Sequence, residues 1–100
     1  MISLMTSCSS EKEARKIAFF LIKKKLAACA VYHKINSIYM WRGKMESGNE
    51  WFLTAKTTAA KSKKAEKAIK KIHSHNIPFI LKQKEKANKE YEAWLKRELK

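Results

Sequence analysis

Hydrophobic and polar residues alternate along the chain with two different periods, and each change of period marks the start of an expected element. The short apolar run from Ile2 to Thr6 is typical of a buried strand. Ser10 and Glu13 then have the spacing of a helix-capping box. Apolar residues at helical spacing follow and predict a helix from about Glu11 to Lys25, where a run of lysines meets the negative end of the helix dipole.

The middle of the chain predicts a long hairpin. Ala28 to Trp41 is rich in β-branched and aromatic residues, as strands are, and Glu50 to Thr57 returns as a second strand. Gly43 and Gly48 bracket the expected turn. In the returning strand, period-two alternation predicts one face with Trp51, Leu53 and Ala55 and another with Phe52, Thr54 and Lys56. Two polar interruptions in the first strand suggest a bulge or bend, at His33-Lys34 and at Asn36-Ser37.

The last third of the chain predicts a helix, a strand and a final helix. The helix covers about Ala59 to His73, and Ile77 to Leu81 forms the strand, in which Pro78 fits a strand start or an edge. Asn88 can cap the last helix. The narrow apolar stripe of the first of these helices contains Ala65, Ala68, Ile69 and Ile72, and that of the last contains Tyr91, Trp94 and Leu95.

The element order is therefore βαββαβ with an added C-terminal helix, in one domain of residues 1–100. This order predicts an α+β, ferredoxin-like sandwich, in which two helices cover one face of a four-stranded antiparallel sheet. The other face stays uncovered. Trp41, Trp51 and Phe52 place large rings on both sides of the central hairpin, so we expect a partner on the uncovered face, and self-association is the economical choice.

Composition adds a strong positive charge. The formal net charge is +14, and a chain this basic attracts polyanions such as nucleic acid or polyphosphate. Lysine greatly outnumbers arginine, which favours an ordinary solvated surface over a recognition surface. We expect no membrane span, no signal peptide and no disulfide framework from only two cysteines, and hence a cytoplasmic protein with reduced thiols.

Several short stretches occur together in an order and spacing that can be compared with a known family. They are Leu26-Ala27-Ala28-Cys29-Ala30, Tyr39-Met40-Trp41-Arg42-Gly43-Lys44-Met45-Glu46, Lys56-Thr57, His73, Ile77-Pro78-Phe79-Ile80, and Asn88-x-x-Tyr91-x-x-Trp94-Leu95. With this series, nearly the whole chain resembles the CutA family, the divalent-cation tolerance proteins.

The resemblance implies a ferredoxin-like subunit whose long central hairpin pairs with neighbours in a homotrimer laid out like the PII signalling proteins. It implies clefts between subunits, a link to tolerance of copper and other divalent cations, no required cofactor and no catalytic reaction. The cleft residues that match are Cys29, Tyr39, Trp41, Lys44, Glu46, Lys56, His73 and Trp94.

Three positions depart from the family pattern. Val31 stands where a polar residue is usual, His75-Asn76 replaces Tyr-Glu, and Phe79 replaces a Glu. Two carboxylates are thereby lost, and the cleft becomes more positive. We therefore also consider a small anionic ligand or polyphosphate in the clefts, held by Lys44, Lys56 and the lysines of the second helix.

The candidate metal ligands are Cys29, His73 and His75, because thiolate and imidazole suit copper or zinc. One chain does not offer a four-ligand zinc pattern, but a cleft could join Cys29 of one chain to His73 of another. The alternative is one buried cysteine and two loop histidines without a metal. Cys8, just past the first expected strand, is interpreted as a small, partly buried residue and not a nucleophile.

Other function classes have weaker support. The chain has no Asp to orient a histidine and only two glycines, so neither a catalytic triad nor a phosphate-binding loop is expected. An acylphosphatase-like hydrolase would need Arg and Asn beside a phosphate loop. Glu46 and Glu50 are expected to form ion pairs across the hairpin, with Arg42, Lys44 and Lys56. A small basic nucleic-acid-binding domain is the main alternative, although Arg42-Gly43-Lys44-Met45 lacks the stacking aromatics of RNA-recognition domains.

Overall fold

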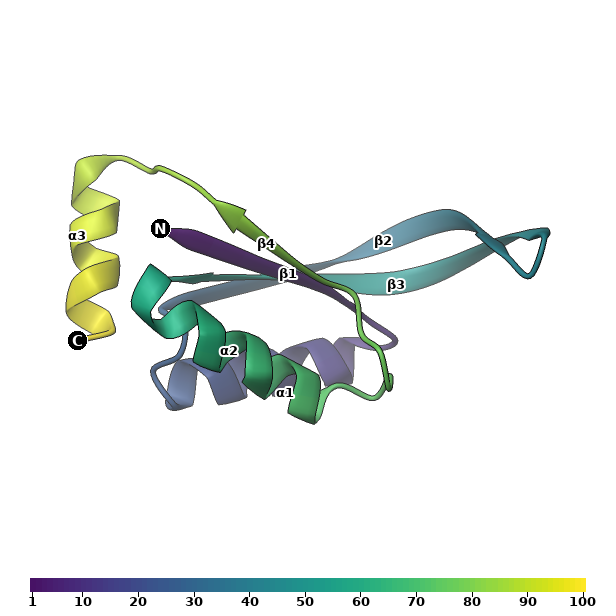
Figure 1. The fold of residues 1–100 in the computed structure, drawn as a ribbon, viewed down its shortest axis with the longest axis horizontal. Helices are drawn as coiled ribbons and strands as arrows, with labels where there is room; N and C mark the ends of the chain where they lie inside the picture. Colours follow the sequence, from purple (N-terminus) through teal and green to yellow (C-terminus); the bar gives the residue numbers. More distant parts are fainter.

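A computed structural model describes all residues, 1–100. Four strands form an antiparallel sheet in the order β2-β3-β1-β4. Helices α1 and α2 cover one face of this sheet, and α3 stands at the end opposite the tip of the β2–β3 hairpin (Figure 1). The predicted ferredoxin-like subunit is confirmed. The elements are β1 (Ile2–Cys8), α1 (Glu11–Lys23), β2 (Cys29–Trp41), β3 (Lys44–Thr57), α2 (Ala59–Ile72), β4 (Ile80–Lys84) and α3 (Lys89–Glu98).

The start of α1 is capped, but not by the full reciprocal box. The Ser10 hydroxyl accepts a hydrogen bond from the Glu13 backbone N–H at 3.1 Å, as predicted. The Glu13 carboxylate does not return to Ser10. It accepts instead from the backbone N–H of Ser9 at 3.0 Å and from that of Ser74 at 2.8 Å. Glu13 therefore links the start of α1 to the loop that follows α2.

Helix α1 ends two residues before the predicted position, at Lys23, because the chain turns into a left-handed residue at Lys25. The Lys25 N–H donates to the Ile22 carbonyl at 3.1 Å, and the Leu26 N–H donates to the Leu21 carbonyl at 2.8 Å. These two bonds are those of a Schellman motif, in which glycine usually occupies the left-handed position. Here a lysine occupies it, with φ of 56°.

Strands of the central hairpin pair without interruption, so a bulge at His33-Lys34 or Asn36-Ser37 is wrong. Cross-strand pairing runs without interruption from Cys29↔Lys56 to Trp41↔Lys44. The turn is the two-residue pair Arg42–Gly43, with φ of 50° and 79°, as in a type I′ turn. Gly48 lies inside β3, opposite Ser37, and not at the turn. Asn36 and Ser37 lie where the hairpin extends beyond β1 and no core imposes alternation, whereas His33 and Lys34 lie within the sheet, opposite residues that also pair with β1.

The core lies between the sheet and its two helices. Leu53 and Ala55 of β3 are fully buried and face the helices, as the alternation predicted. Trp51 packs against this core on the same face and contacts Tyr32 edge-on, with 6.2 Å between ring centres. The other main core residues are Ile2, Leu4 and Cys8 of β1, Ala14, Ile17, Ala18 and Leu21 of α1, and Ala65 and Ile69 of α2.

Strand β4 begins later than predicted, at Ile80 instead of Ile77. Pairing with β1 starts opposite Thr6, whose hydroxyl donates to the Phe79 carbonyl at 2.6 Å. Ile77 is 93% exposed, and Pro78 precedes the strand. Asn88 has the backbone conformation of an N-cap of α3, but its side chain donates to Glu90 and does not cap the helix.

Candidate functional site

The sheet face opposite α1 and α2, here called the open face, carries a row of apolar side chains. Direct cross-strand partners share a face, so the register places them together. Val31 is 52% exposed and Leu81 is 44% exposed, although both lie in strands of the sheet. The apolar residues of the open face are Met5, Val31, Ile35, Phe52 and Leu81. A face of this composition is suited to contact with another protein surface.

Four of the expected cleft residues lie near the tip of the hairpin. Tyr39 pairs with Glu46, and Trp41 pairs with Lys44. Trp41 is 58% exposed, and the Arg42 guanidinium lies over its ring at 5.5 Å from the ring centre. The ion pairs expected across the hairpin are absent, because neither Glu46 nor Glu50 contacts a basic side chain.

The remaining cleft residues gather at the base of the hairpin. Cys29 pairs with Lys56, whose ammonium donates to the Ser3 hydroxyl at 2.8 Å and to the Glu85 carboxylate at 2.9 Å. The hydrogen bonds from Ser3 and from Lys56 lower the pKa of Glu85. Lys56 thus has a carboxylate partner that the sequence did not suggest.

Helix α3 completes the base. Burial raises the pKa of Tyr91, and its contact with Cys29 adds to the rise. The Tyr91 ring packs on Trp94, with 5.4 Å between ring centres. Cys29, Lys56 and Trp94 therefore belong to one local cluster at this end of the sheet.

The tip and the base cannot form one site within a single chain. Cys29 and Tyr39 are ten residues apart on one continuous strand, a distance of about 33 Å at the usual rise per residue. The molecule is 46 Å long, and the hairpin accounts for its extended end (Figure 1). A cleft that uses both groups needs the tip of one chain beside the base of another.

His73 does not meet Cys29 within one chain. It caps the C-terminus of α2, and its side chain is fully buried. Its Nε2 lies 2.8 Å from the Ser7 carbonyl, and its Nδ1 accepts a hydrogen bond from the His75 N–H at 3.2 Å. His75 itself is exposed, with its ring centre 4.9 Å from that of His73. One chain therefore does not assemble the set Cys29, His73 and His75.

The structure brings His73 together with two residues that sequence analysis did not select as ligands. Ligand atoms of Cys8, Glu13 and His73 all lie within 4.8 Å of one another. Burial raises the pKa of the Cys8 thiol to about 12, and the charge of Glu13 adds to the rise. Burial also acts to raise the pKa of Glu13, but hydrogen bonds from Ser74 and Ser9 and the nearby His73 outweigh it and lower the pKa to about 2.

Sequence patterns gave little sign of this cluster. Cys8 and Glu13 flank the start of α1, but His73 follows 60 residues after Glu13, at the end of α2. Only the packing of both helices on the end of β1 brings the three side chains together. The interpretation of Cys8 as partly buried is also corrected, because Cys8 is 1% exposed.

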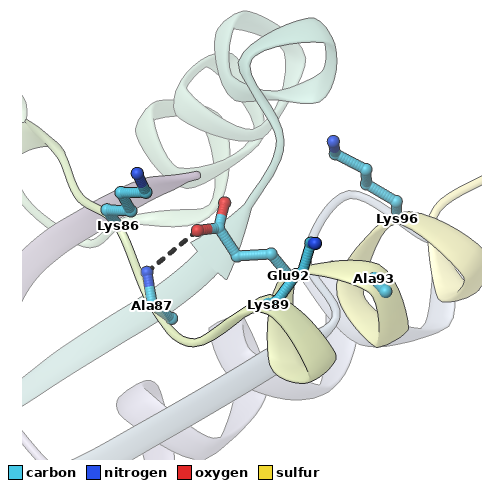
Figure 2. Close-up of a pocket in the computed structure, with 6 residues that line it drawn as sticks. All are labelled: Lys86, Ala87, Lys89, Glu92, Ala93 and Lys96. Atoms are coloured by element: carbon cyan, nitrogen blue, oxygen red, sulfur yellow. Dashed lines mark hydrogen bonds between the residues drawn. The ribbon is translucent and has the colours of Figure 1, made fainter.

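A basic pocket of about 500 Å³ lies beside the N-terminus of α3 (Figure 2). The Glu92 carboxylate accepts a hydrogen bond from the Ala87 N–H at 3.0 Å and binds the N-terminal ammonium at 3.3 Å. None of the expected cleft residues lines this pocket. Its lining residues are Lys86, Ala87, Lys89, Glu92, Ala93 and Lys96.

Comparison with known proteins identifies the family. The model of the CutA1 divalent ion tolerance protein family matches residues 2–98. The divalent-cation tolerance protein CutA of Thermococcus kodakarensis is 33% identical over 98% of this chain and 95% of its own length. The human protein CutA is 29% identical over 90% of this chain, which spans 51% of that protein. No helix of the present structure is long and apolar enough to cross a membrane.

Solved structures agree with this assignment. The D60A mutant of CutA1 from Pyrococcus horikoshii superposes with a TM-score of 0.93 at 31% identity, covering 100% of this chain and 99% of that one. The structure described as the periplasmic divalent cation tolerance protein CutA from Archaeoglobus fulgidus gives 0.92 at 31% identity, with 100% of both chains covered. The chain therefore belongs to the CutA family of divalent-cation tolerance proteins.

Proposed function

We propose that this protein acts as a homotrimeric, non-catalytic binding protein for divalent cations, with ligand sites in clefts between subunits. The observation that carries the proposal is the open face, an apolar sheet surface left exposed in the single chain. Burying such a face between subunits removes apolar area from water, which is the main driving force for association.

The exposed edge of the sheet supports association through the hairpin. β2 is an edge strand of 13 residues and contains no proline. Unpaired backbone groups along a long edge strand are a template for pairing with another chain. A neighbouring hairpin on this edge would satisfy these groups and bring a second chain close to the open face.

Assembly would also complete the expected clefts. The tip residues Tyr39, Trp41, Lys44 and Glu46 and the base residues Cys29, Lys56 and Trp94 are too far apart to meet within one chain. In a closed assembly, the hairpin tip of one subunit reaches the base of the next. Cys29 would then supply a thiolate for copper or another soft cation.

Self-association is tested by placing a charge on the open face. Val31→Lys adds an ammonium at a position 52% exposed in the single chain, and a buried interface there would be disrupted. Phe19→Lys is the matched control, because Phe19 is 66% exposed on α1, away from the sheet. We expect light scattering to show a lower molar mass only for Val31→Lys. Unchanged assembly of both variants would refute this interface.

Cation binding in the clefts is tested by copper titration of the protein and of Cys29→Ser. We expect the substitution to weaken copper binding without changing the molar mass. Equal copper affinity of both proteins would remove Cys29 from the site.

Binding of a small anionic ligand is a second function that we propose for the same clefts. The +14 net charge favours it. Isothermal titration with nucleotides and polyphosphate should release or absorb heat at moderate salt, and the absence of heat would refute it.

Binding of nucleic acid is the candidate from another class, and the +14 charge is what favours it. We expect only non-specific adhesion, with affinity that falls steeply with salt and no preference for sequence or strandedness. A clear preference in a filter-binding assay would contradict this expectation.

We further propose a cytoplasmic location, since both cysteines are free thiols. The relative from Archaeoglobus fulgidus is described as periplasmic, so cell fractionation is the direct test.

A further inference from the structure

Three side chains from three different elements converge at one end of the sheet, away from the proposed clefts. Cys8 is the last residue of β1, Glu13 lies in the first turn of α1, and His73 caps the end of α2. Their candidate ligand atoms lie within 4.8 Å of one another. A thiol, a carboxylate and an imidazole are the three side-chain types that bind zinc in proteins.

The hydrogen bonds of His73 fix which of its ring nitrogens can bind a cation. Its Nε2 lies 2.8 Å from the Ser7 carbonyl, which can only accept, so Nε2 carries the proton. Nδ1 is then the unprotonated nitrogen, which lies 3.9 Å from the nearer Glu13 oxygen and accepts a hydrogen bond from the His75 N–H at 3.2 Å, so a bound cation would replace that hydrogen bond. A backbone carbonyl that fixes the far nitrogen of the ring is the usual outer-shell arrangement of metal-bound histidine.

The other two groups are also held in place. Glu13 is 11% exposed, and each of its carboxylate oxygens accepts a backbone hydrogen bond, one from Ser9 and the other from Ser74. The Cys8 thiol is 1% exposed, free of any disulfide and without a hydrogen-bond partner. A buried thiol therefore lies beside a carboxylate and an imidazole nitrogen, the donor types of a zinc site.

We propose that Cys8, Glu13 and His73 form an intrachain site for a divalent cation of the zinc type. On binding, Cys8 loses its thiol proton to solvent and the thiolate forms a bond to the cation. Zinc bonds of about 2.0–2.3 Å place tetrahedral ligand atoms about 3.3–3.8 Å apart, so the widest separations in the cluster shorten by up to about 1.5 Å. A water molecule or the exposed His75 would take the fourth position.

Basic residues beside the site favour cations whose bonds to thiolate and imidazole are partly covalent. A surface pocket of about 310 Å³ opens beside Glu13 and Ser74, and Lys12 and Lys16 also line it. These ammonium groups oppose a cation held by charge alone, such as Mg²⁺ or Ca²⁺. Thiolate and imidazole donors favour zinc or cobalt instead. The site therefore predicts selectivity against hard cations.

The Cys8 site rests on the proposed cation-binding function. It uses Cys8, whereas the clefts use Cys29, so an experiment can refute either site and leave the other standing. The test is titration of the chelator-treated full chain with Co²⁺, whose bond to a thiolate gives a charge-transfer absorption band. We expect Cys29→Ser, which has no cleft thiolate, to keep the band at one Co²⁺ per chain, displaced by Zn²⁺ and not by Mg²⁺ or Ca²⁺. The double variant Cys8→Ser/Cys29→Ser should lose the band.

A second variant keeps the test decisive if Cys8→Ser folds poorly. Glu13→Gln preserves the shape of the side chain and should weaken Co²⁺ binding more than about tenfold, because even outer-shell partners of a ligand contribute 10–100-fold. Absence of the band in the unmodified protein would overturn the site. A band that is lost in Cys29→Ser and kept in Cys8→Ser would also overturn it and would place the cation in the clefts. His75→Ala identifies the fourth ligand: loss of affinity assigns it to His75, and no change assigns it to water.

Discussion

The left-handed lysine at the end of α1 allows a stability prediction with a defined sign. Lys25 has φ of 56°, donates one hydrogen bond of the Schellman motif and directly precedes Leu26, which donates the other, so its backbone cannot relax without breaking them. A residue with a Cβ loses about 1–2 kcal/mol in this conformation, and glycine loses nothing. Glycine also increases the conformational entropy of the unfolded chain, which lowers the free energy of unfolding by about 0.4–1 kcal/mol. Lys25→Gly should therefore stabilise each chain by about 0.5–1 kcal/mol.

Lys24→Gly is the matched control, because it removes the same charge one residue earlier. Lys24 has φ of −87°, which any L-residue adopts, so glycine there brings only its entropic penalty. We expect this control to destabilise the chain by about 0.5–1 kcal/mol. Guanidinium unfolding at equal protein concentration measures both changes. Loss of stability in both variants, by similar amounts, would refute the reasoning from the backbone conformation.

Two further predictions concern buried polar groups. The Thr57 hydroxyl is fully buried and donates to the Leu26 carbonyl at 2.7 Å, so Thr57→Val should lower the free energy of unfolding by about 1–2 kcal/mol. The partly exposed Thr54→Val serves as its control, and an equal effect of both would contradict the role of the hydrogen bond. In Cys29→Ser treated with chelator, the remaining thiol of Cys8 should resist a thiol reagent at pH 8 until the chain unfolds, because Cys8 is 1% exposed and burial raises its pKa to about 12. Rapid labelling of the folded variant would contradict the burial of this thiol.

The fold was predictable from local patterns because each element carries its own signal. The cap at Ser10 and the alternation at residues 51–56 were found where the structure has them. The errors occurred where nothing local constrains the chain. The polar residues at 33–37 suggested a break, yet cross-strand hydrogen bonds keep β2 regular even beyond the core.

The candidate site was harder to predict because its geometry depends on distant segments. The resemblance supplied Cys29, Lys56 and Trp94, and the structure gathers them at one end of the sheet. It could not supply the partner of Lys56, because Glu85 approaches only when β4 and α3 pack. The neighbours of His73 were missed for the same reason, since spacing along the chain does not show that α2 ends beside β1.

The measurement that tests the central claim most directly is the molar mass of the purified protein, by light scattering on a sizing column at moderate salt. The proposal of a homotrimer predicts a mass of three 11.7 kDa chains, about 35 kDa, that does not change on dilution through the micromolar range. A mass of one chain would contradict it. The open face and Trp41 would then remain in contact with water, no cleft could join the hairpin tip to Cys29, and binding of nucleic acid would become the leading hypothesis.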